Sequence, residues 1–334
     1  MKVFADYHHG GLYHALTLLL VKRMGFELFR PIGLEWVEQG IWQYSQNPPT
    51  QRQYLDPVNC ELKPDGYYYW RDTAEEIDHK CLTWDQFQAM DIDLVMGSCC
   101  QHELPFSYLQ KKYKPEAKFI RLLGNSGEPI DWSISRNIID TTNLYEGPPG
   151  VNRVVIHKEF PVDLFYYQPP PVKKKIRSYL NCFNETPFYQ IWHTYKNLMP
   201  EFEWKMHGLN GDDKFITPVS ALAQSMRETS FFWHIKSHGE GFGHIVHNAL
   251  AIGRPIITIK SYYKGKMIYP FLEDGITCID LESNTMERNI ERIREYSEPE
   301  RLQTMCIAAY DRFHDNISFD NDQRLFEDFL GRLN

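Results

Sequence analysis

The stretch "KSHGEGFGHIVHN", residues 236–248, gathers groups that could bind an anion and a sugar. It places one carboxylate, Glu240, in a glycine-rich turn. Gly241 and Gly243 have no Cβ, so the backbone there can approach a ligand closely. The N–H groups of the helical turn that follows attract an anion, and phosphate fits them best. The stretch therefore predicts a phosphate site at the start of a helix, with a plain chain reversal as the alternative.

The helix after Gly243 has an apolar and a polar face at about 100° per residue. The apolar face carries Ile245, Val246, Ala249 and Leu250. The polar face carries His244, His247 and Asn248. We expect the apolar face to pack on a sheet and the polar face to meet a diphosphate or a sugar hydroxyl in the crevice. A polar face that only meets water is the alternative.

The residue patterns of a metal site, a serine hydrolase, a P-loop and a dinucleotide-binding fold are absent from the sequence. His244 and His247 have no carboxylate or Cys at a metal-ligand spacing, and "DID" at 91–93 reads as the start of a buried strand, so no metal site is expected. The chain has no nucleophile elbow, no Walker A loop and no intact dinucleotide fingerprint after its first strand. The seven cysteines are unevenly spaced, and we interpret them as free thiols.

Strands alternate with helices along most of the chain, which predicts an α/β protein with parallel sheets covered on both faces. The first half is expected to contain strands at 2–5, 27–32, 91–98, 117–125 and 152–160, with helices at 12–24 and 103–113. The second half is expected to contain strands at 176–183, 202–210, 231–237 and 255–260, with helices at 187–199 and 218–229. Both glycine turns, at Gly10-Gly11 and at 241–243, then lie where a strand ends and a helix begins, at the ligand-binding edge of a parallel sheet.

Composition bounds the remaining possibilities. A chain of 334 residues is about twice the usual domain size, so we expect two domains. The formal net charge of -8 disfavours nucleic acid as the main partner. Apolar runs are too short for a transmembrane segment, and the amino terminus has no signal-peptide pattern. We therefore expect a cytoplasmic location, with a membrane-peripheral one as the alternative. The proline-rich stretch 166–175 is the expected linker.

With these elements in place, "EGFGHIVHNALAIGRPII" resembles the signature of the retaining glycosyltransferases of family 4, also called group 1, which have the two-Rossmann-domain GT-B fold. Three further segments are similar to that family in the right order: "HHGGLYHALTLLL", "FPVDLFYYQP" and "FLEDGITCIDL". The resemblance covers most of the chain except 34–80. It implies two Rossmann-like domains facing across a cleft, at 1–168 and 169–316, with a closing helix at 317–334 that packs back on the first domain.

The aromatic segment 34–80 forms an insertion in the first domain, either as a small hairpin or as a surface that selects the acceptor. The resemblance places the acceptor mainly in the first domain and a nucleotide sugar, such as a UDP- or GDP-sugar, mainly in the second. It implies sugar transfer to a glycan or other hydroxyl in the cleft, with no metal and no further cofactor. A nucleic-acid hydroxyl is a less favoured acceptor because of the acidic pI.

Site residues follow from the same resemblance. Glu240 would hold the donor sugar and be catalytic, while Gly10 and Gly11 would let the first domain close over the phosphates. Donor binding is expected at Asn184, Lys236, His238, Gly241, Phe242, Gly243, His244 and Asn248. A retaining reaction needs no strong base, whereas an inverting one would need a general base, for which His9, His8 or Asp6 is available.

The chain departs from the family pattern at three places. Asn248 replaces the second Glu, which holds the ribose hydroxyls, so that contact loses its charge. The segment "NCFNETPF" lacks the usual Arg and Lys, so Lys236, His244, Lys264 or Lys266 would have to stabilise the leaving group. Asn125 stands where the family carries a sugar-contacting His. These departures keep two alternatives open: a weak or inactive nucleotide-sugar-binding protein, and a nucleotide-sugar epimerase.

Overall fold

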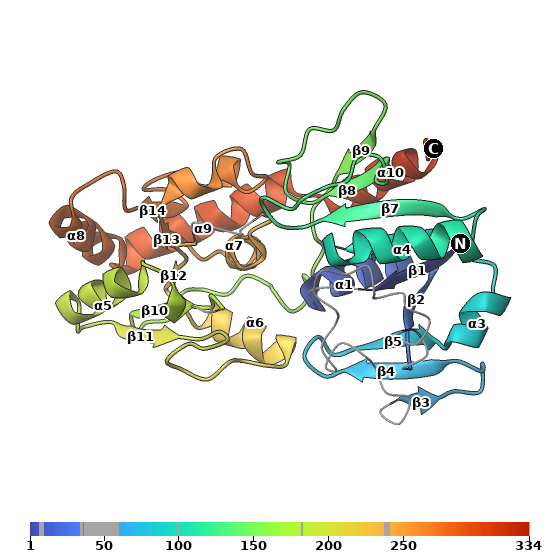
Figure 1. The fold of residues 1–334 in the computed structure, drawn as a ribbon. Coiled ribbons are helices and arrows are strands. Elements are labelled where there is room, and N and C mark those ends of the chain that lie inside the picture. The colour runs from blue at the N-terminus through green and yellow to red at the C-terminus, as the bar shows by residue number, and fades with distance from the viewer. Residues whose placement is uncertain are drawn as a thin grey trace. The chain divides into compact units, whose positions relative to one another are not determined.

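The structure is a computed structural model that describes residues 1–6, 10–33, 36, 60–98, 100–181, 183–236 and 241–333. Its contacts divide the chain into two compact units. Unit 1 contains Met1–Phe160 and Phe319–Asn334, and unit 2 contains Pro161–Ser318. The sequence places its boundaries at 168/169 and 316/317, close to these changeovers, and that domain assignment stays a prediction. Figure 1 labels the helices and strands.

Unit 1 is built on a nine-stranded sheet, in the order β3-β4-β5-β2-β1-β6-β7-β8-β9. Neighbouring strands from β5 to β9 pair in parallel, and β3, β4 and β5 pair in antiparallel fashion. The strands are β1 (Lys2–Asp6), β2 (Glu27–Pro31), β3 (Glu61–Leu62), β4 (Tyr68–Asp72), β5 (Ile77–Leu82), β6 (Leu94–Ser98), β7 (Lys118–Leu123), β8 (Asn137–Asp140) and β9 (Asn152–Val155).

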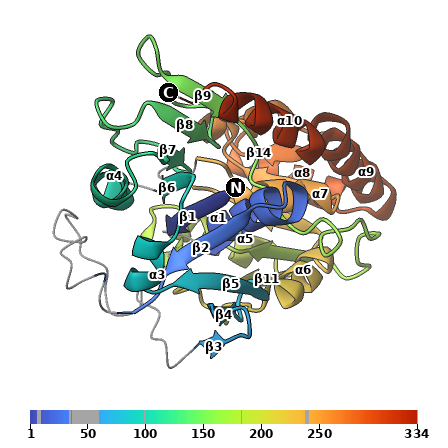
Figure 2. The ribbon, with the colours of Figure 1, turned by 90° about the vertical axis from the view of Figure 1, so that its right-hand side faces the viewer.

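Helices cover both faces of this sheet, as Figures 1 and 2 show. The helices of unit 1 are α1 (Gly10–Leu16), the π-helix η1 (Thr17–Arg23), α3 (Trp84–Ala89), α4 (Cys100–Tyr113) and α10 (Phe319–Leu330). Successive side chains of a strand point to opposite faces. Val3 and Ala5 accordingly join a core with α1, η1 and α10, and Phe4 joins the core on the other face with α3 and α4.

The described part of segment 34–80 contains antiparallel strands that pair as a hairpin, and its role toward an acceptor stays a prediction. Strands β3, β4 and β5 lie at one edge of the sheet, and β5 joins it through β2. Trp36 is fully buried, stacks on Phe4 at 5.1 Å between ring centroids, and donates its indole N–H to the Ile32 carbonyl at 3.2 Å. Thus part of the insertion belongs to the core of unit 1.

Unit 2 is built on five parallel strands, in the order β11-β10-β12-β13-β14. They are β10 (Lys175–Ser178), β11 (Glu203–Met206), β12 (Phe231–Trp233), β13 (Ile256–Thr258) and β14 (Cys278–Asp280). The helices are α5 (Tyr189–Leu198), α6 (Val219–Arg227), α7 (His244–Ala251), α8 (Met286–Tyr296) and α9 (Pro299–Asn316). Short 3-10 turns are η5 (Phe183–Glu185), η6 (Lys260–Tyr263) and η7 (Tyr269–Phe271). The predicted α/β class with parallel sheets is confirmed.

The proline-rich stretch expected as a linker is held against unit 2 by two arginines. Arg227 lies over the Tyr166 ring at 4.1 Å and donates to the Leu164 carbonyl. Arg254 is fully buried, donates to the carbonyls of Pro169, at 3.3 Å, and Arg227, and has a pKa lowered by that burial. The start of unit 2 is therefore packed rather than loosely solvated.

Candidate functional site

The strand order of unit 2 reverses direction between β10 and β12. From β10 the chain moves outward to β11, and then returns to the other side of β10 to form β12. In an open parallel sheet, the carboxyl ends of two such strands flank the crevice that binds ligands. The candidate site therefore consists of the segments after β10 and β12, together with α7.

Two uncharged aromatic side chains lie in the part of the candidate site that follows β10. Tyr179 follows β10, stacks on the His207 ring at 5.5 Å, and its hydroxyl hydrogen-bonds to Ser225 Oγ at 2.9 Å. Burial raises the pKa of Tyr179, and burial lowers the pKa of His207 below its ordinary value. Both side chains are therefore uncharged near pH 7. Asn184 lies in η5 after β10 and is exposed.

The glycine turn after β12 has the geometry of an anion site. Gly243 is the N-cap of α7 in the left-handed region, with φ 74° and ψ 49°, and as a glycine it supplies no capping side chain. The backbone N–H groups of a first helical turn favour an anionic acceptor. A Cβ on Gly243 would make only ordinary contact, 3.6 Å from Ile268 Cγ2, so glycine is required there by the backbone angle. Gly241 and Phe242 are buried.

The side chains of α7 are more buried than the helical wheel predicts. Asn248 is 1% exposed, and within the described part of the chain its carboxamide oxygen has no hydrogen-bond partner. His247 is fully buried with its ring stacked on Phe242, at 4.0 Å between centroids and 2° between planes. His244 is half-buried. The expectation of an open polar face is therefore wrong for His247, which packs inside the unit.

Cations lie on the loops next to this turn. Ile268 belongs to the loop after η6, so its contact with Gly243 places that loop beside the turn. In the same loop, Lys266 is 8% exposed and its ammonium lies 5.4 Å from the centre of the Tyr263 ring, whereas Lys264 is exposed. Lys236 is half-buried just beyond β12. Among the expected donor-binding residues, Gly241, Phe242, Gly243, His244 and Asn248 lie in the turn and in α7, and Lys236 lies shortly after β12.

Four expected residues fall outside the described part of the chain: His8, His9, His238 and Glu240. Gly10 and Gly11 begin α1 after β1, and Gly11 is buried. Asp6, the third candidate base, is 5% exposed and accepts a hydrogen bond from Arg30 at 3.0 Å, so its carboxylate is held in an ion pair. Roles for Glu240, His9 and His238 stay predictions.

Asn125 lies in a loop that buried charges hold at the carboxyl end of β7. The Glu128 carboxylate accepts from the backbone N–H groups of Gly124 and Asn125, at 3.0 and 2.8 Å. It also accepts from the fully buried guanidinium of Arg121 at 2.9 Å. This loop therefore has a fixed shape at the edge of the unit 1 sheet.

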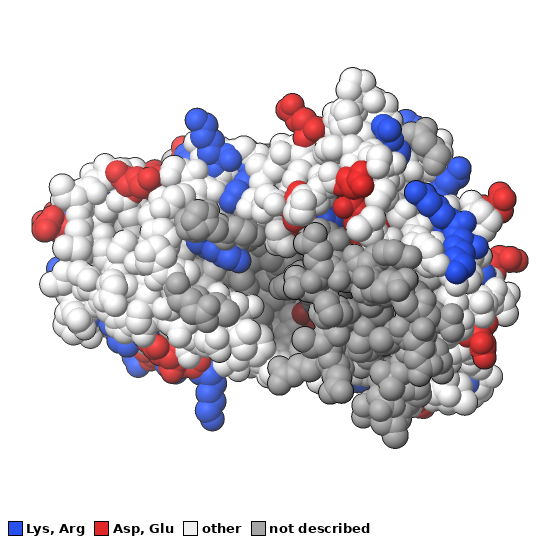
Figure 3. Space-filling model, in the orientation of Figure 1, with Lys and Arg blue, Asp and Glu red and all other residues white. Residues whose placement is uncertain are grey.

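The described residues show neither a metal site nor a membrane span. Within the described ranges, no three His, Cys, Asp or Glu side chains group as metal ligands. None of the helices in that part of the chain has the length and apolar character needed to cross a membrane. On the face drawn in Figure 3, Lys and Arg alternate with Asp and Glu over the described surface.

Comparison with solved structures decides the fold. HepE of Anabaena, in complex with UDP-glucose, aligns over 99% of both chains with a TM-score of 0.65 and 12% identity. Sucrose-phosphate synthase of Thermosynechococcus elongatus aligns over 99% of this chain and 98% of its own, with a TM-score of 0.65 and 10% identity. The chain has the GT-B fold.

A glycosyltransferase of Rickettsia africae aligns equally well, with a TM-score of 0.65, 12% identity and 99% of both chains covered. No family model matches the chain, and no curated protein matches its sequence. At these identities the likeness shows the GT-B fold alone, and the expected membership of family 4 is not shown.

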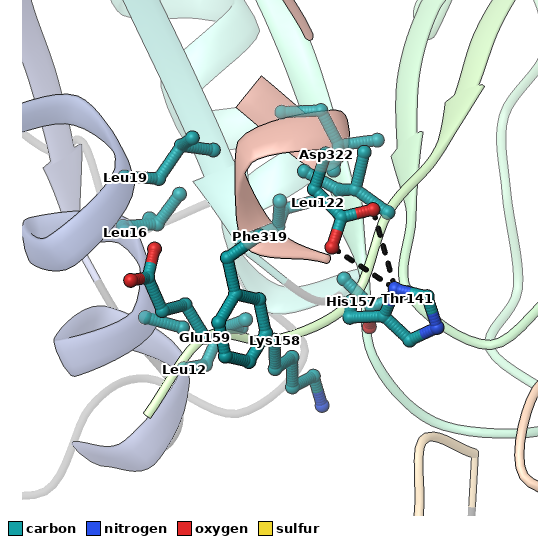
Figure 4. A pocket seen from close by; sticks show the side chains of 13 residues that line it. Leu12, Leu16, Leu19, Leu122, Thr141, His157, Lys158, Glu159, Phe319 and Asp322 are labelled. Atoms are coloured by element: carbon teal, nitrogen blue, oxygen red, sulfur yellow. Dashed lines mark hydrogen bonds and ion pairs between the residues drawn. The ribbon is translucent and has the colours of Figure 1, made fainter. Parts of the chain in front are cut away.

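A small apolar cavity lies in unit 1, and no sequence pattern predicted it (Figure 4). Its volume is about 20 Å³, which is room for roughly one water molecule. At its rim, His157 Nδ1 and Asp322 Oδ2 are 2.9 Å apart. The lining residues are Leu12, Ala15, Leu16, Leu19, Leu122, Ile139, Thr141, Ile156, His157, Lys158, Glu159, Phe319 and Asp322.

Proposed function

We propose that this protein is a glycosyltransferase that moves a sugar from a nucleotide-sugar donor to an acceptor hydroxyl, with the donor bound by unit 2. One observation carries the proposal. Helix α7 begins at a left-handed glycine N-cap, at the reversal point of a parallel sheet, and the same helix carries a buried amide oxygen that has no hydrogen-bond partner among the described residues. Solved glycosyltransferases share the fold, and HepE was crystallised with UDP-glucose, which favours a UDP-sugar as the first donor to test.

The diphosphate would lie against the backbone N–H groups at residues 241–244. Its charge would be balanced by the helix start and by Lys236, His244 or Lys266, since no Arg or Lys stands at 181–188. The Asn248 carboxamide oxygen would accept a hydrogen bond from a ribose hydroxyl, which relieves its unpaired state. Glu240 would hold the sugar hydroxyls, and Gly10 and Gly11 would contribute from unit 1.

We further propose a retaining, metal-independent reaction of the family 4 type. The bond between the sugar C1 and the diphosphate oxygen breaks while C1 bonds to the acceptor oxygen on the same face. The acceptor proton passes to the departing diphosphate, so the protein needs to supply charge stabilisation rather than a strong base. An inverting reaction would instead need His9 or His8 as a general base. A glycan or other hydroxyl acceptor would bind unit 1, in the cytoplasm.

Thermal unfolding with a panel of UDP-, GDP-, ADP- and TDP-sugars tests donor binding. A ligand present at 100 times its dissociation constant stabilises the folded state by about 2.7 kcal/mol, so one of the four nucleotides should raise the melting temperature by several degrees. Stabilisation by none of them would refute the proposed function.

The fate of the bound donor separates transfer from the alternatives. Transfer predicts that nucleoside diphosphate is released when an acceptor is added, with the sugar recovered on that acceptor and its anomeric configuration unchanged. An epimerase would alter the donor sugar without an acceptor. Binding with no conversion under any acceptor would identify a nucleotide-sugar-binding protein.

A further inference from the structure

His247 is fully buried beside the glycine turn, yet it is none of the groups proposed to touch the donor. Its imidazole ring lies flat on the Phe242 ring, at 4.0 Å and 2°, and its centroid lies 6.2 Å from that of Phe271. Burial of an imidazole costs free energy unless its polar atoms are hydrogen-bonded. The contacts of this ring therefore point to a role within the turn.

The hydrogen bond of the ring ends on the turn itself. His247 Nδ1 lies 3.0 Å from the carbonyl oxygen of Gly243, and a carbonyl only accepts, so Nδ1 carries the hydrogen. The backbone N–H of His247 donates to the same oxygen at 2.9 Å. One residue thus engages the carbonyl of the left-handed N-cap twice, through its main chain and through its side chain.

These two contacts constrain neighbouring parts of the turn. The hydrogen bond fixes the peptide plane after Gly243, whose N–H belongs to His244, the first residue of α7. The ring stack fixes Phe242, the residue before that glycine. Glycine has the freest backbone of all residues, so a turn containing Gly241 and Gly243 depends on such neighbours for a single conformation.

We propose that His247 is a positioning residue that holds residues 241–244 so that their N–H groups converge on the donor diphosphate. This inference rests on the proposed function. Groups that bind a developing charge must be fixed in advance, because small displacements of such groups weaken both binding and transition-state stabilisation. His247 acts through Gly243 and Phe242 and touches no substrate.

Three substitutions separate the two contacts. His247→Asn keeps a donor near the position of Nδ1 but removes the stacked ring. His247→Phe keeps a ring but removes the hydrogen bond. His247→Leu removes both. The control Ile293→Val trims a fully buried side chain of α8, where a lost methylene lowers stability without touching the turn.

The measurements are nucleoside diphosphate affinity, kcat and KM of transfer, and hydrogen exchange of the amides of residues 241–245. We expect His247→Phe to weaken nucleoside diphosphate binding about tenfold, to lower kcat, and to speed exchange at those amides. His247→Asn should stay within about threefold of the wild-type affinity, and His247→Leu should be at least as impaired as His247→Phe. Ile293→Val should change only the melting temperature.

The outcomes distinguish this inference from the proposed function. Lower melting temperatures with unchanged affinity, kcat and exchange at 241–245 would make His247 a purely structural residue and overturn the inference alone. A wild-type protein that binds no nucleoside diphosphate would overturn the proposed function, and the inference with it. In that case, fast amide exchange at 241–245 in His247→Phe would still show that His247 holds the turn in one conformation. The turn would not, however, serve donor binding.

Discussion

Among single residues, Asn248 has a side chain that is both buried and short of a hydrogen bond. It is 1% exposed, and its carboxamide oxygen has no hydrogen-bond partner among the described residues. Such groups are rare in folded proteins because each costs about 1–3 kcal/mol. In the proposed donor site, a ribose hydroxyl would supply the missing hydrogen bond.

Replacing Asn248 with Leu tests that explanation. Leu has nearly the same shape but cannot accept a hydrogen bond, so we expect the free protein to become slightly more stable and nucleoside diphosphate binding to weaken about tenfold, or about 1.4 kcal/mol. Calorimetric titration and thermal unfolding measure the two effects. Leu250→Met, a volume-conserving change at a buried position of α7, is the control, and equal losses of affinity in both variants would place Asn248 outside the site.

At the scale of elements, the carboxyl end of α7 depends on one glycine. Gly253 has φ +70°, and a Cβ there would lie 2.7 Å from the Cys306 carbonyl oxygen in α9 and 2.7 Å from Cδ2 of the Tyr167 ring. The residue thus lets α7, α9 and the first segment of unit 2 approach one another. The sequence motif "AIGRP" indicated a helix end here, but not this close approach.

Gly253→Ala should destabilise unit 2 by about 2–4 kcal/mol, because it adds a left-handed Ala and a clash with two rigid neighbours. Gly66→Ala is the matched comparison. Gly66 also has a positive φ, +83°, but no atom of the described residues lies within 4 Å of its Cβ position. The expected cost is therefore the backbone strain alone, about 1–2 kcal/mol. Denaturant unfolding of both variants measures the difference. Equal losses of unfolding free energy in the two variants would mean that the neighbours of Gly253 shift to make room for the added methyl group.

At the scale of the whole molecule, the chain returns to unit 1 at its end. Helix α10 packs on β9 and places Phe326 and Phe329, both fully buried, in the core that contains β1 and α1. Arg23 of η1 hydrogen-bonds both Glu159, at 2.7 Å, and Asp320, at 2.5 Å, beside the two points where the chain changes unit. The two changeover segments are thus joined within unit 1.

Phe329→Ala should therefore destabilise unit 1, although residue 329 is far from the rest of that unit in sequence. Removing a fully buried Phe side chain costs about 3–5 kcal/mol. Limited proteolysis with identification of the cleaved sites should report earlier cutting in 60–160 than in 161–318. Leu325→Ala, on the same helix but 39% exposed, should behave like the wild type. Earlier cutting in 161–318 would contradict this assignment of α10.

Much of the fold was predictable because it depends on local patterns. Alternation along 2–5 and the apolar run at 12–24 predicted β1 and the helical α1 and η1, and "PIITIK" predicted β13. The short strand β8, Asn137–Asp140, was missed, since four residues carry too little periodicity to separate a strand from a loop. The place of β5, parallel to β2 at the sheet edge, is a non-local pairing that no local pattern encodes.

For the site, the residue types predicted a glycine turn, a helix after it and side chains suited to an anion and a sugar. Which of these side chains are buried, and what they pack against, depended on contacts made through folding. A helical wheel places His247 on the polar face, but the turn brings Phe242 back over that face and buries the ring. Ile268 Cγ2 lies 3.6 Å from the Cβ position of Gly243, which places the loop that carries Lys266 beside the turn. Both results depend on residues that meet through folding, which periodicity along the chain does not record.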